Sequence, residues 1–262
     1  MSSQGNKRNA ITRMVVFLIA YILAIVLFHA YRALVAPKLE PLTAPAVLTV
    51  VSRMLVPYAV IWPLLYVALL RRFEPRKVTA GKKPGAGLLV KLFVFQAACA
   101  ALPIISHMVR HLISGEHVQA STANPAPDLS AITLFILLVF NPVAEEIVVR
   151  RMTLDRLRVL GDKPAILYSS FLFALMHVFS QGPAVAVMTF PVSLIWAFIT
   201  IKSGSLVYAI VLHALGNLYA FVLPQIAART EKSGMIYVLV ATAIVPVVAL
   251  ILYLRDREVF AL

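Results

Sequence analysis

The chain has 262 residues, of which 61% are hydrophobic and only 13% are charged, and its mean hydropathy is +0.90. A soluble domain carries about 25% charged residues, so the composition excludes an ordinary soluble protein. It predicts an all-α polytopic membrane protein that forms a single integral membrane domain over residues 1–262. The net charge of +13 does not indicate a nucleic-acid partner, because basic residues gather in the cytoplasmic loops of membrane proteins.

Eight segments are apolar and long enough to cross a bilayer, which requires about 20 residues of helix. The first has no small-residue cleavage site after its apolar run, so we expect it to remain as a signal anchor. In chain order the expected helices are 13–34, 46–70, 86–110, 130–150, 164–180, 183–202, 205–224 and 235–254.

The distribution of lysine and arginine predicts the orientation of these helices. With the N-terminus in the cytoplasm, 17 of them lie on the cytoplasmic side and five on the opposite side. The positive-inside rule therefore predicts cytoplasmic N- and C-termini, and we expect a prokaryotic plasma-membrane protein. Residues 154–160 alternate apolar and basic side chains and are expected to form a short interfacial helix. Cys99 lies in an apolar run and is expected to be a buried free thiol.

The fourth segment carries charges inside apolar sequence: Glu145, Glu146 and Arg150. One charge at the centre of a membrane helix costs about 2.5–3.5 kcal/mol, so such residues indicate a functional site by default. Glu146 and Arg150 are four apart with the acid first, the favourable order for an ion pair. Glu145 then faces elsewhere with no local partner, as suits a general base. Pro142 either kinks the helix beside the glutamates or is simply tolerated there.

Two later segments add polar groups at helical spacing. His177 follows Phe173 by four residues, and Asn217 follows His213 by four, so each pair shares a helix face. Histidine can accept a proton from water or orient it, and two converging N–H donors can hold an oxyanion. The same groups allow a metal alternative, because Glu145, His177 and His213 form a two-histidine, one-carboxylate set of the kind that binds catalytic zinc.

A second histidine cluster lies near the outer end of the third segment. His107 and His111 are four apart, with Glu116 and His117 close behind. Such a cluster can bind a metal ion, but a solvated position at the membrane interface is the expectation we favour.

The depth of these groups in the membrane sets a further condition. Glu145 is about 8 Å of helix from the expected end of its segment, whereas His177 lies about 20 Å beyond Pro164. We therefore expect the fourth helix to continue past Arg150, since no helix breaker occurs before Gly161.

The three motifs together resemble the CPBP family, which comprises the type II CAAX prenyl endopeptidases and the bacteriocin-processing, or Abi, proteins. The resemblance covers about 130–220, the motif-bearing core. It departs from the family at Val149 and Arg151, where an aromatic residue and a glycine are common. The motifs that carry it are Glu145-Glu146-x-x-x-Arg150, Phe173-x-x-x-His177 and His213-x-x-x-Asn217.

The resemblance assigns expected roles to these residues. It implies that Glu145 activates water with His177, that His213 and Asn217 stabilise the oxyanion, and that Glu146 and Arg150 support them. The family was named as metalloproteases, yet a metal-free glutamate mechanism is argued for its prenyl proteases. The implied cofactor is therefore either none or one divalent metal such as zinc.

The implied function is an intramembrane endopeptidase whose helices surround a catalytic cavity. Its partners would be the lipid bilayer and a membrane-associated peptide or protein, prenylated or not, processed in CAAX fashion or at a leader or signal peptide. Two other classes stay open: a non-catalytic scaffold or regulator of a cell-envelope partner, and a proton-coupled transporter. The lack of an internal repeat counts against the transporter.

Overall fold

The computed structural model describes residues 3–42, 44–76, 81–114 and 129–261, leaving aside the side chains of 3–8, 106–108, 110–112 and 114. Within this part every regular element is a helix, and eight helices are long and apolar enough to cross a membrane. The predicted all-α membrane fold is therefore confirmed. The eight spans are, in order, Asn9–Leu42, Pro45–Leu70, Ala86–Ile105, Ala131–Leu160, Asp162–Gln181, Pro183–Ser203, Val207–Ala227 and Glu231–Arg255.

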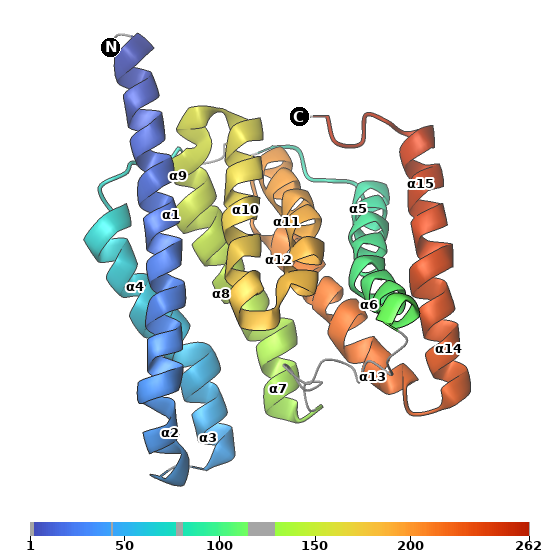
Figure 1. The fold of residues 1–262 in the computed structure, drawn as a ribbon. Coiled ribbons are helices and arrows are strands. Elements are labelled where there is room, and N and C mark those ends of the chain that lie inside the picture. Colours follow the sequence, from blue (N-terminus) through green and yellow to red (C-terminus); the bar gives the residue numbers. More distant parts are fainter. Residues whose placement is uncertain (1–2, 43, 77–80, 115–128, 262) are drawn as a thin grey trace.

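Most spans are built from several helical pieces, which are labelled in Figure 1. Stretches of π-helix join many of the α-helical pieces; they cover Val51–Ile61, Tyr66–Leu70, Ile136–Phe140, Ile147–Leu154, Leu218–Val222 and Val240–Ile244. The α-helices are α1 (Ser3–Leu34), α2 (Ala36–Leu39), α3 (Pro45–Val50), α4 (Trp62–Leu65), α5 (Ala86–Cys99), α6 (Ala101–Ser114), α7 (Ala131–Phe135), α8 (Asn141–Glu146), α9 (Asp155–Leu157), α10 (Asp162–Gln181), α11 (Pro183–Ser203), α12 (Val207–Asn217), α13 (Leu223–Ala227), α14 (Glu231–Leu239) and α15 (Val245–Arg255).

The fourth span differs in length from the expected segment. It continues to Leu160, so the expected extension past Arg150 is confirmed. A separate interfacial helix over 154–160 is wrong: these residues continue the span, and Leu154 and Leu157 are fully buried. Leu154 and Leu157 thus face the protein interior, whereas Val159 is exposed.

The third segment also departs from expectation. It breaks at Ala100 into α5 and α6, three residues before Pro103, which has no N–H with which to bond the turn before it. Cys99 ends α5 as a free thiol and is half-buried, not buried as expected. The side chains of His107 and His111, and residues 116 and 117, lie outside the described residues.

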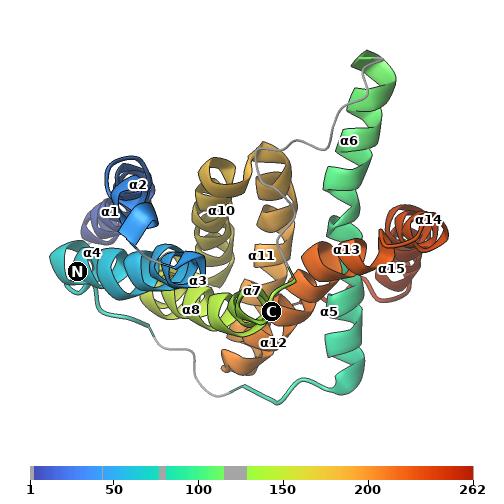
Figure 2. The same ribbon diagram turned by 90° about the horizontal axis from the view of Figure 1, so that it is seen from below.

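The helices that carry the motifs, α8, α10 and α12, lie at the centre of the bundle together with α11. α10 packs along α11, α11 contacts α12, and α12 contacts α8. α1 to α4 flank this centre on one side, and α5, α14 and α15 flank it on the other (Figures 1 and 2). The sixth span is the most buried of the eight, and large apolar side chains cover much of the outer surface, as contact with lipid requires.

Candidate functional site

Glu146 and Arg150 form the buried centre of the site. Arg150 Nε donates to Glu146 Oε2 over 2.9 Å, and both side chains are 0% exposed. The ion pair expected from their spacing is therefore present. Arg150 Nη2 also donates to the Oγ of Ser193 (3.0 Å) and to its carbonyl oxygen (3.2 Å). These bonds tie the fourth span to α11.

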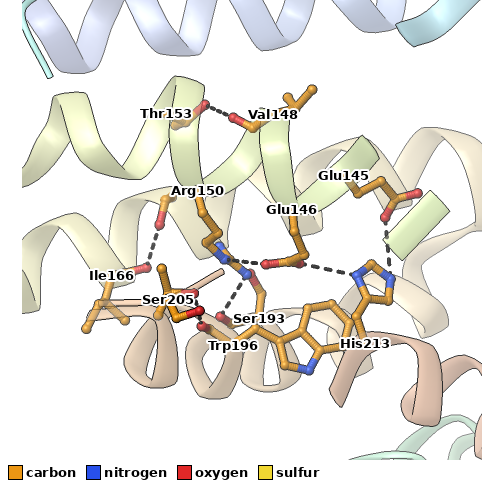
Figure 3. A network of polar contacts seen from close by, with 12 residues as sticks. Glu145, Glu146, Val148, Arg150, Thr153, Ile166, Ser193, Trp196, Ser205 and His213 are labelled. Carbon is orange, nitrogen blue, oxygen red and sulfur yellow. Dashed lines mark hydrogen bonds and ion pairs between the residues drawn. The ribbon is translucent and has the colours of Figure 1, made fainter. Parts of the chain in front are cut away.

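His213 lies between the two glutamates, as Figure 3 shows. Its Nδ1 is 3.2 Å from Glu146 Oε1, and its Nε2 is 3.6 Å from Glu145 Oε2. The two carboxylates point in different directions, but the imidazole presents a nitrogen on each side and so reaches both. An ionised Glu146 can only accept a hydrogen bond, so this contact places a proton on Nδ1.

Glu145 has a partner that its own helix does not supply. Tyr58 Oη, on the second span, donates to Glu145 Oε1 over 3.0 Å. The Glu145 side chain is 13% exposed, whereas that of Glu146 is fully buried. Of the two adjacent acids, Glu145 is therefore the one that a water molecule can reach.

The ring of His213 is held by aromatic and polar contacts. Trp196 of α11 stacks on it, with ring centroids 3.9 Å apart and an interplanar angle of 16°. The Nε1 of Trp196 donates to Gln96 Oε1 over 2.7 Å, and Gln96 Nε2 donates to the carbonyl of Leu212 over 2.8 Å. These contacts fix the imidazole plane, and with it the direction of both nitrogens.

His177 approaches the same region from α10. Its Nδ1 is 2.9 Å from the carbonyl oxygen of Phe173, so Nδ1 donates and the neutral ring keeps Nε2 as an acceptor. The Phe173 ring lies 4.6 Å from the His177 ring and 6.2 Å from that of His213. His177 is close enough to Glu145 and His213 to interact with them electrostatically.

Asn217 is tied to the fourth span. Its Nδ2 donates to the carbonyl of Leu137 over 2.8 Å. A side-chain amide has two N–H donors, so this bond uses one and orients the group. The neighbouring Asn141 has a buried Oδ1 with no hydrogen-bond partner in the described structure.

The predicted residues therefore fall into three groups. Glu145, Glu146, Arg150 and His213 form one contact network. Phe173 and His177 border it through ring contacts, and Asn217 anchors the seventh span to the fourth.

The predicted metal set is not gathered as a metal centre. Among the described residues, no group of three or more His, Cys, Asp or Glu side chains could hold a metal ion. Both nitrogens of His213 face carboxylates, and His177 Nδ1 faces a carbonyl. As arranged here, Glu145, His177 and His213 thus do not form a metal site. The divalent metal implied by the resemblance stays a prediction.

A cavity of about 810 Å³ lies between the second and fourth spans. Tyr58, which lines it, links it directly to Glu145. Other lining residues are mainly apolar, among them Leu55, Trp62, Phe140, Val148 and Met152. An extended apolar chain could therefore lie beside the candidate base.

The structure adds contacts that the sequence does not reveal: Tyr58 to Glu145, Ser193 to Arg150, and the pair Gln96 and Trp196 beside His213. Of these residues, Gln96 is the one that the sequence could have marked as functional, since it is a polar residue in an apolar helix. The others are ordinary members of membrane segments.

Comparison with known proteins gives a family match over the segment that contains these groups. Residues 127–219 match the family model of the Rce1-like type II CAAX prenyl endopeptidases. The resemblance read from the motifs is confirmed. The matched segment holds both glutamates, both histidines, Arg150, Phe173 and Asn217. Searches of curated proteins and of solved structures gave no match. The Rce1-like match implies a protease, and the eight spans make the chain an integral membrane protein.

Proposed function

We propose that the chain is an intramembrane endopeptidase that hydrolyses a peptide bond of a membrane-associated protein or peptide, either in CAAX fashion or at a leader or signal peptide. One observation carries the proposal. Inside the segment that matches the Rce1-like family, Glu145 is partly accessible and contacts both Tyr58 and His213 across three spans. A carboxylate placed in this way can take a proton from water.

In the proposed reaction, Glu145 removes a proton from a water molecule as its oxygen attacks the scissile carbonyl carbon. His177 orients this water through Nε2, the acceptor that its bond to Phe173 leaves available. When the tetrahedral intermediate collapses and the C–N bond breaks, the proton on Glu145 passes to the leaving amine. The side chains thus end the cycle in their starting protonation states.

The oxyanion would be stabilised by His213 and Asn217. Nδ1 of His213 is already a donor to Glu146, so a second donor at Nε2 requires the imidazolium form. A carboxylate faces each of the two ring nitrogens. Arg150 holds Glu146 in place for this contact.

The test is cleavage by the purified protein of a panel of prenylated C-terminal peptides and leader-type peptides. Glu145→Ala and His177→Ala should each lower the rate by about 10²–10⁴-fold, the usual contribution of a general base. Glu40→Gln, at an exposed glutamate of the first span, is the matched control and should retain the rate.

Wild-type cleavage by Glu145→Ala would overturn the proposal. A cellular phenotype that survives this substitution would favour the scaffold alternative. Activity lost with a chelator and restored by zinc would show a metal requirement, whereas chelator-resistant activity would support the side-chain reaction described above.

A further inference from the structure

We infer that Arg13 and Arg72 bind the headgroup of an anionic phospholipid beside Phe73, at the end of the second span. The site lies apart from the candidate catalytic residues, and the inference does not depend on the proposed protease activity. It starts from arginine side chains that the rest of the described structure leaves without a negative partner.

Three segments that are distant in the sequence meet around the buried ring of Phe73. The Arg13 guanidinium of α1 lies 5.2 Å from the centre of this ring, and that of Arg72 lies 5.0 Å from it. Arg13 Nη1 also donates to the carbonyls of Glu74 (3.1 Å) and Arg156 (2.8 Å). The first span, the chain after the second span and the end of the fourth span are thus joined at one point, where α1 passes α9 in Figure 1.

The positive charge at this point is not balanced. Among the described residues, Arg13, Arg72 and Arg156 take no part in an ion pair. The hydrogen bonds of Arg13 and Arg156 all end on neutral oxygens. These two residues are buried, at 8% and 6% exposed, and are close enough to repel one another. Burying unpaired like charges is costly, so the arrangement favours an anion that binds beside them.

The neighbouring carboxylates do not supply this anion. Glu74 is close enough to attract Arg13, but it is exposed and forms no ion pair in the described part of the chain. Asp155 is already paired with Arg151 over 3.3 Å. The three unpaired guanidinium groups together with Glu74 therefore carry a net charge of +2 at neutral pH.

Several donors at this point are free for an anion. Arg13 Nη2 donates to no described group, and the exposed Arg72 has the ring of Phe73 as its contact but no hydrogen bond within the described chain. Further inside, Arg156 Nε is buried without a hydrogen-bond partner among the described residues. Buried donors normally have a partner, so its absence here adds to the unbalanced charge. Guanidinium forks match the oxygens of a phosphate, which is therefore the anion that this site suits.

The outer face of the second span points to a lipid as the source of the phosphate. Val60, Leu64 and Val67 are 56%, 58% and 51% exposed, and none of them lines the cavity described above. In a bilayer such a face contacts acyl chains. The span ends at Leu70, so a lipid packed along it places its headgroup at the level of Arg72. A free phosphate would gain nothing from the apolar face.

The headgroup should carry a net negative charge. A zwitterionic headgroup brings a cation next to its phosphate, and the positive site repels that cation. With the predicted orientation of the spans, this end of the protein faces the cytoplasmic leaflet, where anionic lipids attract basic segments. Phosphatidylglycerol has the chemistry required, because its one charge is the phosphate itself.

The experiment uses native mass spectrometry of the full chain in an uncharged detergent, with palmitoyl-oleoyl phosphatidylglycerol or phosphatidylcholine added. The first phosphatidylglycerol should bind at least about tenfold more tightly than the first phosphatidylcholine, since each arginine near a membrane surface contributes about fivefold to the affinity for an anionic lipid. Arg72→Gln should weaken phosphatidylglycerol binding about fivefold and change phosphatidylcholine binding little. sn-Glycerol 3-phosphate, at the same concentration as the lipid, should not displace it.

Two matched variants define the outcome. Arg72→Lys keeps the charge but loses the planar fork, so it should retain part of the preference. Lys163→Gln removes an exposed charge from the first turn of α10, next to the end of the fourth span, and should retain all of it. Equal affinity for the two lipids, equal weakening by Arg72→Gln and Lys163→Gln, or displacement by sn-glycerol 3-phosphate would overturn the inference. Lipid binding is measured without cleavage, so its failure is distinct from failure of the proposed protease activity.

Discussion

Replacing Glu146 by glutamine should destabilise the protein strongly while changing its shape very little. The substitution leaves the guanidinium of Arg150 fully buried, with the hydroxyl and carbonyl of Ser193 as its remaining partners in this contact set. Removing one partner of a buried ion pair costs about 3–5 kcal/mol, because the other charge stays uncompensated. We therefore expect the free energy of unfolding to fall by at least about 3 kcal/mol.

The chain supplies a matched control for this prediction. Arg158 and Asp162 have the same four-residue spacing, and their ion pair of 2.8 Å is as short as the buried one, but their side chains are 10% and 37% exposed. Asp162→Asn should therefore cost no more than about 1 kcal/mol. Because the two ion pairs share their spacing and length, the difference in unfolding free energy between the two variants reports the effect of burial.

Unfolding can be followed by titration with SDS in mixed micelles, using the fluorescence of Trp62 and Trp196. Trp196 stacks on His213 and so reports on the site itself. A double variant, Glu146→Leu with Arg150→Met, should be less destabilised than Glu146→Gln, since it leaves no buried charge. If Glu146→Gln costs no more than Asp162→Asn, the argument from an uncompensated charge is wrong.

Two further predictions concern the contact of Tyr58 with Glu145 and the ion pair of Lys91 with Asp256. Tyr58→Phe removes the hydrogen bond to Glu145 and should lower the cleavage rate about tenfold with unchanged unfolding, as loss of one charge-assisted bond implies; an unchanged rate would show that the tyrosine does not position the base. The hydrogen bond from Lys91 lowers the pKa of Asp256 below its ordinary value of 3.8, so the stabilisation is present above that pH and is lost as the pH falls through the folded-state pKa. The melting temperatures of the wild type and Asp256→Asn should therefore differ at pH 6 and converge under acid conditions, and a difference that persists in acid would contradict this assignment.

Hydropathy predicts the spans because a membrane imposes one simple requirement, a continuous apolar helix. The end of the fourth span is less predictable from that requirement. Arg156 and Arg158 indicate a membrane surface, yet both are buried here. Arg158 donates to Asp162 and to the carbonyl of Arg76, which follows the second span. Arg156 donates to Tyr66 Oη and to the carbonyls of the preceding turn. Charge marks a boundary only when the charged group faces water.

The sequence could indicate which polar residues belong to the site, because they stand out from apolar segments. The pairing of Glu146 with Arg150 follows from helix geometry within one segment. The contact of Tyr58 with Glu145 does not, because the residues are 87 positions apart and a tyrosine in a membrane segment has many other uses. The position of His213 between two carboxylates likewise depends on how α12 packs against α8, which no local pattern specifies.

The π-helical stretch Ile147–Leu154 follows directly after the two glutamates. Its wider turns hold more residues than the same length of α-helix, and Thr153 Oγ1 bonds the carbonyl of Val148, five positions back. Deleting one residue here would turn the residues that follow to a different face relative to Glu145. Leu154 and Leu157 would then turn away from the interior, and Arg151 would leave the cavity. The number of residues between Glu145 and the buried leucines thus matters as much as their identity, and length variation in this stretch should be far rarer than substitution.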